Sequence, residues 1–397
     1  RRVLFRSKIA ERILREGKYN AKIESTTNRR KALEGADYVI VAILHGGIDV
    51  ITKDIKIPLK YGVDQCIGDT LGPGGVFRAL RTIPVMLDIC KDMEEICPNA
   101  LMLNYTNPMA MLCWAMNKYS KIKVIGLCHS VQGTSEQLAK YIGADYKDIT
   151  YKVAGINHQA WFLEFKWKGK DAYPILREKI NEDEIYGKDT TRCEMFKHLD
   201  YFVTESSGHN SEYNPWFRKR KDLLEKYTNK RDPWNGEHGF ILWIYGTDRE
   251  NYEEQLKAMA DGTDPIDFTR SHEYGSYIIN SIETGELSVF NGNVVNEGLI
   301  TNLPYGSLVE VPCLVDKNGI QPTHIGNLPT HLAALNRTNI NVQELAVEAA
   351  VTGDKRKAFH AVAMDPLTQA VLSLEEINSM VNEMFETEKE WLPQFKI

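Results

Sequence analysis

Residues 36–44 read Ala-Asp-Tyr-Val-Ile-Val-Ala-Ile-Leu, and this stretch decides the fold class. A continuous apolar run rich in β-branched residues is typical of a parallel strand that is buried on both faces. The run ends at His45-Gly46-Gly47, where small residues let a ligand approach the backbone or simply form a turn. We therefore expect one strand of an α/β sheet, with a candidate site at its end.

Helix and strand patterns alternate over the following hundred residues. A helix-period stretch runs from about Arg78 to Ile96 and stops at Cys97-Pro98-Asn99. We then expect a strand at 100–104, a helix from 107 to about 119, a strand at 123–127 and a helix from 132 to about 142. Strands that alternate with helices at this spacing indicate βαβ units and a doubly wound, Rossmann-like sheet.

The pattern changes after about residue 150. Residues 161–167 alternate and a turn follows at 168–171, which predicts an antiparallel hairpin. Residues 190–262 are largely helical in pattern, residues 285–330 predict short strands, and residues 341–388 predict three helices. We therefore expect two domains, a Rossmann-like domain at 1–155 and an interleaved α+β domain at 156–397.

Two polar segments that follow short apolar runs are the candidate site. Cys-His-Ser-Val-Gln-Gly at 128–133 follows the run 124–127, and Gly-Ile-Asn-His-Gln-Ala-Trp at 155–161 continues the run 151–156. If both runs are strands of one sheet, Cys128 and His158 emerge at strand ends, where open α/β sheets place ligands. A thiolate and an imidazole suit a divalent transition metal, and two ligands leave positions open for substrate oxygens. The alternative is a buried cysteine beside a core histidine.

Composition narrows the class of protein. A chain of 397 residues with 43% hydrophobic residues can bury a large core. A net charge of −6 argues against nucleic acid or an anionic membrane surface as the main partner. The seven cysteines include no C-x-x-C pair, which indicates reduced thiols and a cytoplasmic location. No apolar stretch approaches the roughly 18 residues that a membrane span needs.

Five segments together carry a family resemblance. They are Ile-Gly-Asp-Thr-Leu-Gly-Pro-Gly-Gly at 67–75, Asn-Tyr-Thr-Asn-Pro at 104–108, Leu-Cys-His-Ser-Val-Gln-Gly at 127–133, Ala-Gly-Ile-Asn-His at 154–158 and Thr-Glu-Ser-Ser-Gly-His-Asn-Ser-Glu-Tyr-Asn at 204–214. From about Ala21 to the carboxyl end, the chain resembles glycoside hydrolase family 4. Within that family the resemblance is closest to enzymes of unphosphorylated α-galactosides such as melibiose.

The resemblance implies an NAD-dependent reaction, an exception to glycosidase chemistry with two carboxylates. Bound NAD+ takes hydride from C3 of the sugar, a base removes the C2 proton, and the glycosidic oxygen is expelled. Water then adds at C1 and the hydride returns. A divalent cation, Mn2+, acts as Lewis acid. The first domain would bind NAD, and the second would serve catalysis and the assembly of a homodimer or homotetramer.

Site roles follow from the same resemblance. Cys128 and His158 match the metal ligands, and a structural Zn2+ site is the alternative. His129 matches the proton donor to the leaving oxygen, or else a residue that orients the site. Tyr213 is the expected base, since nearby positive charge can lower the pKa of a phenol, and Glu212 is the alternate base.

Further contacts are expected with sugar and cofactor. Asp69 and Asn107 match contacts to sugar hydroxyls, although each could instead cap a loop or helix. The predicted cofactor contacts are Ala42, Gly46, Gly47 and Asn104. A sugar platform of Trp216, Trp234 and Trp243 is conceivable, but we expect these aromatic residues in the core.

The amino terminus carries an expectation of its own. The chain does not begin with Met, and it lacks the G-x-G-x-x-G turn that holds the pyrophosphate in Rossmann domains. We expect the first βαβ unit to be missing, and NAD+ binding and activity of the chain as written to be weak. The alternatives are a doubly wound protein that binds no dinucleotide, a 2-hydroxyacid dehydrogenase, or a family member acting on α-galacturonides, α-glucuronides or α-glucosides.

Overall fold

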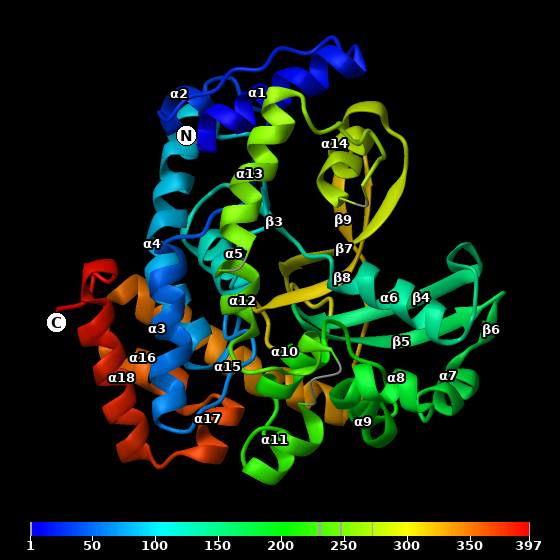
Figure 1. Ribbon diagram of the computed structural model, residues 1–397, viewed down its shortest axis with the longest axis vertical. Coiled ribbons are helices and arrows are strands. Elements are labelled where there is room, and N and C mark those ends of the chain that lie inside the picture. Colours follow the sequence, from blue (N-terminus) through cyan, green and yellow to red (C-terminus); the bar gives the residue numbers. More distant parts are fainter. Residues whose placement is uncertain (1, 229–231, 247, 272, 397) are drawn as a thin grey trace.

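A single mixed sheet runs through the molecule, as Figure 1 shows for the computed structural model. The structure describes residues 2–228, 232–246, 248–271 and 273–396. Its strands are β1 (Tyr38–Val41), β2 (Leu101–Asn104), β3 (Lys123–Leu127), β4 (Ile149–Ile156), β5 (Gln159–Trp167), β6 (Lys170–Asp171), β7 (Ser288–Val295), β8 (Leu308–Asp316) and β9 (Gly319–Pro322). The strand order is β1-β2-β3-β7-β8-β4-β5-β6, and β9 pairs with β8.

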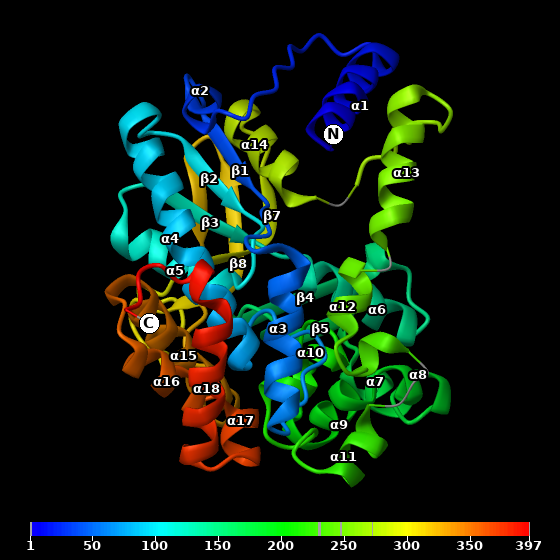
Figure 2. The same cartoon turned by 60° about the vertical axis from the view of Figure 1, so that its left-hand side comes forward.

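Helices pack against this sheet. In the first half of the chain they are α1 (Arg2–Gly17), α2 (Arg29–Leu33), α3 (Gly47–Lys60), α4 (Gly72–Ile96), α5 (Met109–Tyr119), α6 (Ser130–Tyr141), η1 (Tyr146–Asp148), α7 (Tyr173–Lys179), α8 (Asp183–Lys188) and α9 (Thr190–Leu199). In the second half they are α10 (Ser207–Tyr213), α11 (Lys221–Tyr227), η2 (Pro233–Asn235), α12 (Phe240–Gly246), α13 (Asp248–Asp261), α14 (Tyr274–Thr284), α15 (Thr330–Thr352), α16 (Lys355–Ala363), α17 (Pro366–Val371), α18 (Leu374–Glu388) and η3 (Lys389–Trp391). Figures 1 and 2 both place α16–α18 on one side and α7–α9 on the other. None of the described helices is long and apolar enough to cross a bilayer.

The predicted α/β class is confirmed, and its parallel part is β1, β2 and β3. These strands pair in register, with Val41 opposite Asn104 and Asn104 opposite Gly126. Because parallel strands end at the same edge of a sheet, the chain segments after all three strands leave together. The remaining strands pair antiparallel, and β3 joins them through β7. The predicted domain boundary at 155/156 stays a prediction.

Two helix predictions need correction. Helix α4 begins at Gly72 rather than near Arg78, because Pro73 is tolerated in the first turn of a helix. The interval 341–388 holds parts of four helices instead of three. Asp365 caps α17 with Pro366 as its first residue, and Ser373 starts α18 with a capping box. These local capping signals divide a stretch whose apolar periodicity is continuous.

The glycines at the start of α4 bring a loop onto that helix. A Cβ on Gly75 would lie 2.4 Å from the carbonyl carbon of Thr70, and one on Gly74 would lie 2.5 Å from the oxygen of Gly68. Only glycine permits this approach of helix and loop. The loop at 66–70 therefore lies directly against α4, and it carries Asp69 into the site.

Candidate active site

Cys128 and His158, the predicted metal ligands, meet in the structure. Cys128 directly follows β3, and His158 lies in the two-residue turn between β4 and β5. Ligand atoms of Cys128, His158 and Glu205 all lie within 4.8 Å of one another. A thiolate, an imidazole and a carboxylate are together a donor set for a divalent transition metal. The chemistry of these residues therefore fits the cation that the sequence predicts.

The two nitrogens of His158 face different groups. Nδ1 lies 3.1 Å from the hydroxyl of Thr70 and 3.2 Å from that of Tyr213. Nε2 lies 3.6 Å from Oε2 of Glu205. Burial alone would lower the pKa of His158, but Glu205 and Cys128 outweigh it and raise the pKa to about 10. The position thus attracts positive charge, as a cation site must.

A second group of potential ligands shares His158. Asp69, His158 and His209 also have ligand atoms within 4.8 Å of one another, and all three residues are buried. The rings of His158 and His209 are 4.9 Å apart, and Nε2 of His209 lies 3.8 Å from Oδ1 of Asp69. Burial alone would raise the pKa of Asp69, but Arg78 and the two histidines hold it below its ordinary value. Asp69 is therefore a buried anion beside His158 and His209.

Tyr213 and Glu212, the two predicted bases, are neighbours at the end of α10 with different surroundings. The hydroxyl of Tyr213 faces His158, and the two rings are nearly parallel at 11°. Burial, Asp69 and Glu212 raise the pKa of Tyr213 well above its usual value. The expected lowering of this pKa therefore requires the positive charge of bound cofactors, because the surrounding protein residues act in the opposite direction.

Glu212 is engaged with the backbone instead. Its carboxylate accepts hydrogen bonds from the N–H groups of Cys66 at 2.7 Å, Ile67 at 3.1 Å and Gly68 at 2.9 Å. Both oxygens are therefore used to hold the loop that leads to Asp69. This geometry favours Tyr213 over Glu212 as the group that faces a substrate.

The predicted sugar contacts lie together. The amide of Asn107 donates to Oδ2 of Asp69 at 3.3 Å, and Arg78 lies 3.5 Å from the same oxygen. Asn107 also accepts from the backbone N–H of Met109 at 3.2 Å, so the alternative of a helix cap is part of its role. Asp69 and Asn107 thus form one polar contact surface beside His158.

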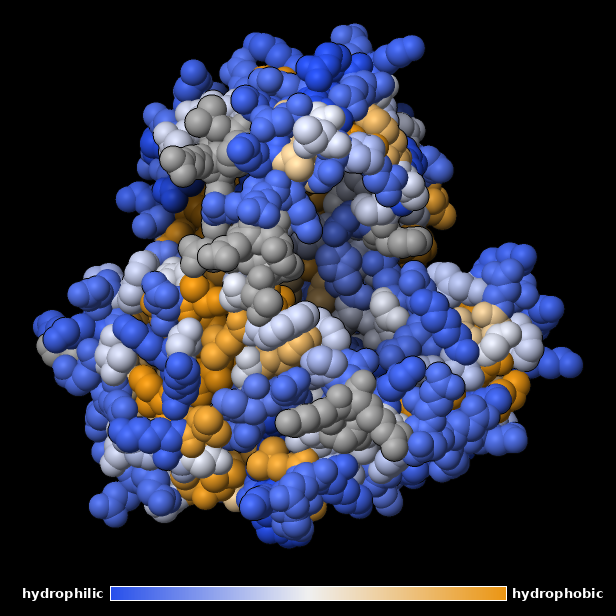
Figure 3. All heavy atoms as spheres, viewed as in Figure 1, coloured by the Kyte–Doolittle hydropathy of each residue, from blue (hydrophilic) through white to orange (hydrophobic). Residues whose placement is uncertain are grey.

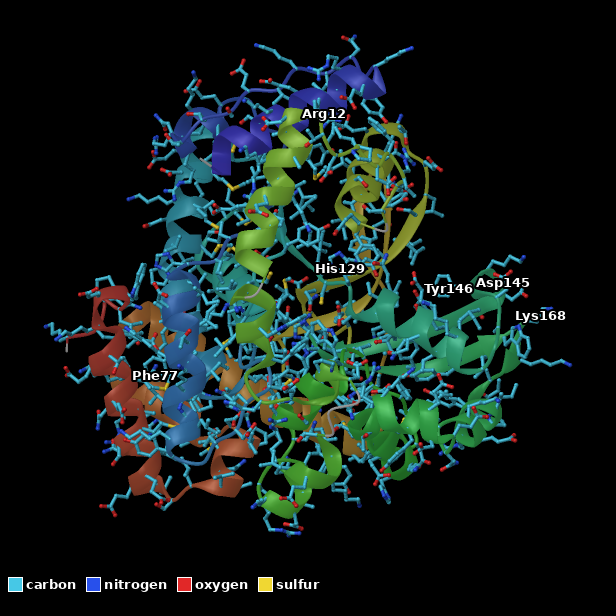
Figure 4. All side chains as sticks on the ribbon, viewed as in Figure 1. Arg12, Phe77, His129, Asp145, Tyr146 and Lys168 are labelled. Atoms are coloured by element: carbon cyan, nitrogen blue, oxygen red, sulfur yellow. The ribbon has the colours of Figure 1, made fainter. Side chains whose placement is uncertain are left out.

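His129 lies at the rim of the site. Its Nε2 is 2.8 Å from Oε1 of Glu273, and its side chain is 55% exposed. Its ring stacks on Tyr105, with centroids 6.0 Å apart. Figure 3 shows this face of the molecule hollowed near its centre, and Figure 4 places His129 at the same point. An exposed imidazole here can reach a ligand that enters from solvent.

A pocket of about 420 Å³ opens beside Cys128 and His129. Arg192 and Glu205 are among its lining residues. Arg192 is buried, and Nε and Nη2 donate to the two oxygens of Asp189 at 2.8 and 2.7 Å. Its charge is therefore neutralised within the wall. Ser130 also lines this pocket, and its buried hydroxyl has no hydrogen-bond partner among the residues that the structure describes.

The predicted cofactor contacts lie at the end of the parallel strands. Ala42 is exposed just after β1, while Asn104 is buried at the end of β2. Gly46 and Gly47 have φ values of 89° and 66° at the start of α3, where no side chain caps the helix. Uncapped backbone N–H groups at a helix start suit an anionic ligand. These residues share the sheet edge with Cys128.

Two residues of the site, Glu205 and His209, were not predicted. The stretch 204–214 was singled out, but it shows no periodicity that could indicate which side chains point inward. Glu205 has a φ of 71°, a left-handed conformation that its residue type does not signal. Glu205 precedes α10, so the rule that i and i+4 side chains share a helix face does not apply to it, and no local pattern indicates that it meets His209.

The expectation of a tryptophan core is wrong. Trp216, Trp234 and Trp243 are 38%, 44% and 60% exposed. Trp234 lines the pocket and stacks on His209 at an interplanar angle of 13°. The ring of Trp234 thus contacts His209 and also Phe240 while much of the residue stays exposed, a placement that aromatic residues allow.

The comparisons with known proteins identify the family. Residues 2–144 match the model of family 4 glycosyl hydrolases, and residues 153–368 match their C-terminal domain. The α-galactosidase of Bacillus subtilis (strain 168) is 46% identical over 94% of this chain and 86% of its own length. The α-galactosidase of Rhizobium meliloti (strain 1021) is 40% identical over 98% and 80%, respectively.

A solved structure shares the fold. It is a 6-phospho-alpha-glucosidase from gut microorganisms in complex with NAD and Mn2+, with a TM-score of 0.77 and 19% identity. The match covers 99% of this chain and 90% of that one. With both family models matched over most of the sequence, the chain belongs to the family 4 glycosyl hydrolases.

Proposed function

We propose that this chain hydrolyses unphosphorylated α-galactosides such as melibiose, with NAD+ and Mn2+ as cofactors. The observation that carries the proposal is the 46% and 40% identity to two α-galactosidases over nearly the whole chain. The donor set of Cys128, His158 and Glu205 supports a metal site. The fold shared with a glucosidase that binds NAD and Mn2+ supports the same cofactors.

The charge of the pocket supports a neutral sugar. A galacturonide or a sugar phosphate needs a free cation to bind its anionic group. Arg192 is buried in the pocket wall and paired with both oxygens of Asp189. Its charge is therefore matched within the protein, which favours the hydroxymethyl group of a galactoside.

Cys128 and His158 would hold Mn2+, and Ala42, Gly46, Gly47 and Asn104 would contact NAD+. When bound, the cation would supply Lewis acidity and NAD+ would supply a reversible hydride acceptor for C3 of the sugar. Asp69 and Asn107 bind sugar hydroxyls and orient the ring. They lie beside His158, so they fix the sugar against the metal ligands.

Two residues move protons in this scheme. Tyr213 removes the proton from C2, and its hydroxyl lies 3.2 Å from Nδ1 of His158. A proton on Nδ1 can donate to the phenolate and stabilise it. His129 gives a proton to the leaving oxygen at the rim, where Glu273 orients its imidazole.

The test follows the C2 proton. The protein is incubated in D2O with Mn2+, NAD+, a thiol reductant and aryl glycosides of galactose, galacturonic acid, glucose and 6-phosphogalactose. We expect weak turnover of the α-galactoside by the chain as written, with deuterium at C2 of the released galactose by NMR. Tyr213→Phe should lose both turnover and exchange. Galactose without deuterium at C2 would exclude the elimination mechanism, and preference for another glycoside would exclude the substrate.

A further inference from the structure

Glu205 is the carboxylate of the metal cluster, and it has no established role. Its side chain is 17% exposed and lines the pocket. Oε2 lies 3.6 Å from Nε2 of His158, and a carboxylate oxygen lies within 4.8 Å of Sγ of Cys128. The carboxylate therefore faces the same space as the thiolate and the imidazole.

The two oxygens of Glu205 have different neighbours. Oε1 lies 3.3 Å from Nδ1 of His209, and the same nitrogen lies 2.8 Å from the hydroxyl of Ser206. His209 is itself buried, and its other nitrogen faces Asp69. Because His209 engages Oε1, the carboxylate is held in one orientation, with Oε2 directed toward His158.

The backbone at both positions is unusual. His158 and Glu205 have φ values of 64° and 71°, in the left-handed region that residues other than glycine rarely adopt. Such conformations persist where the surrounding structure fixes them, and they cluster at ligand sites. Here the two unusual residues come from separate segments and direct their side chains to one point.

We propose that Glu205 is a third protein ligand of the divalent cation, beside Cys128 and His158. The inference rests on the metal dependence of the proposed function and adds a residue to it. Manganese accepts carboxylate oxygens readily, whereas a thiolate alone favours softer metals. Glu205 therefore shifts the site toward Mn2+. In a six-coordinate cation, three protein ligands still leave positions open for sugar oxygens.

The alternative is that Glu205 only orients His158. In that case Nε2 of His158 carries a proton and donates it to Oε2, so the metal must bind Nδ1. Nδ1 already faces the hydroxyls of Thr70 and Tyr213 at 3.1 and 3.2 Å, whereas Nε2 faces Glu205 at 3.6 Å. Coordination through Nε2 leaves Nδ1 for those hydroxyls, the usual arrangement in which a metal-bound histidine donates its other N–H to a neighbour. The geometry thus favours ligation.

The test measures Mn2+ affinity without substrate. Free Mn2+ is followed by EPR during titration of the wild type, Glu205→Gln, Glu205→Asp, Asp232→Asn and Cys128→Ser. Glu205→Gln removes the charge, and Glu205→Asp keeps the charge but withdraws the oxygens by one methylene. We expect both substitutions to raise the Kd for Mn2+ at least about tenfold. Mutating even a residue that only supports a metal ligand typically lowers metal affinity by this factor. Asp232 lines the same pocket outside the cluster, so Asp232→Asn should bind Mn2+ like the wild type.

Co2+ spectra provide a second readout. The thiolate charge-transfer band should persist in Glu205→Gln, because Cys128 still binds, while the d–d bands change with the lost carboxylate. Loss of the charge-transfer band would mean that Glu205 maintains the site structurally and would overturn ligation.

The remaining outcomes separate this inference from the proposed function. Weak binding by Glu205→Gln together with normal binding by Glu205→Asp would indicate a general charge effect and overturn ligation. Normal Mn2+ binding by both Glu205 variants would also overturn ligation. A wild type that binds Mn2+ no better than Cys128→Ser would overturn the metal dependence, and with it both proposals.

Discussion

Glu212 shows how one buried carboxylate can organise a site without touching substrate. It accepts three backbone hydrogen bonds from residues 66–68, next to Asp69. A glutamine at this position offers one oxygen and directs an NH2 group at N–H donors. We expect Glu212→Gln to lower the free energy of unfolding by about 1–3 kcal/mol, because a buried donor loses its acceptor. Urea denaturation measures this change.

The same variant distinguishes the two candidate bases. With Tyr213 intact, Glu212→Gln should raise KM through a displaced Asp69 but retain deuterium exchange at C2. The exposed Glu237→Gln is the matched control for stability. If Glu212→Gln folds with wild-type stability and loses all exchange, Glu212 is the base and the structural role is wrong.

Single residues differ in how far the sequence predicts them. Cys128 and His158 follow recognisable apolar runs, which is why both could be chosen from the sequence. Their convergence does not follow from strand ends, because β7 and β8 lie between β3 and β4 and the three pairings that connect them are antiparallel. The positions of Glu205 and His209 could not be predicted, because the left-handed backbone at Glu205 and the connection that follows β5 and β6 decide where these side chains point. The exposure of Trp234 depends likewise on the packing of His209 against one face of its ring, and no local pattern encodes that contact.

At the scale of elements, a buried ion cluster joins three helices. Arg81 of α4 donates to Asp54 of α3 and, at 3.2 Å, to Glu388 of α18, and these side chains are at most 1% exposed. Figure 1 shows the three helices side by side. Removing one member of such a cluster leaves buried charges unpaired, which costs about 3–5 kcal/mol. We expect this loss of stability from Arg81→Leu, and a smaller one from Arg81→Lys, which retains the charge.

The loss should depend on pH. Burial and Asp54 raise the pKa of Glu388 well above its ordinary value of 4.5. A carboxyl group with a raised pKa binds more protons when folded, so its contribution to stability is greatest at low pH and falls as pH rises. Without Arg81, only protonation can remove the repulsion between the buried carboxylates of Asp54 and Glu388. The deficit of Arg81→Leu should therefore be smaller at pH 5 than at pH 8 in chemical denaturation, and equal deficits would contradict this role.

Elements with strong local signals were predictable, and their boundaries less so. β3 was expected at 123–127 and lies there, because a short apolar run has clear ends. The start of α4 was missed because Gly72, Gly74 and Gly75 are typical of a loop, and their purpose is a close approach to residues 68–70. That approach is a tertiary contact, so helix propensity alone does not indicate it.

For the whole molecule, the two parts of the sheet are connected by the short pairing of β3 with β7. Only Gly126 with Asn293 and Leu127 with Gly292 pair there, within the described residues. The β3–β7 pairing connects the parallel strands to the antiparallel part of the sheet. A Cβ on Gly126 would lie 2.6 Å from Sδ of Met109 and 2.9 Å from Cβ of Asn293. A larger residue at this position would therefore force these side chains or the strands to shift.

We expect Gly126→Ala to lower stability by about 1–3 kcal/mol, the usual cost of an extra methyl group in a packed core. Gly133→Ala in α6 is the control, because its Cβ would meet nothing within 4 Å. That change should stabilise the protein by about 0.4–1 kcal/mol. Because one sheet spans both halves, tryptophan fluorescence and circular dichroism should report a single urea transition in both variants. Separate transitions would show that the halves unfold independently, as expected if the boundary at 155/156 divides two autonomous domains.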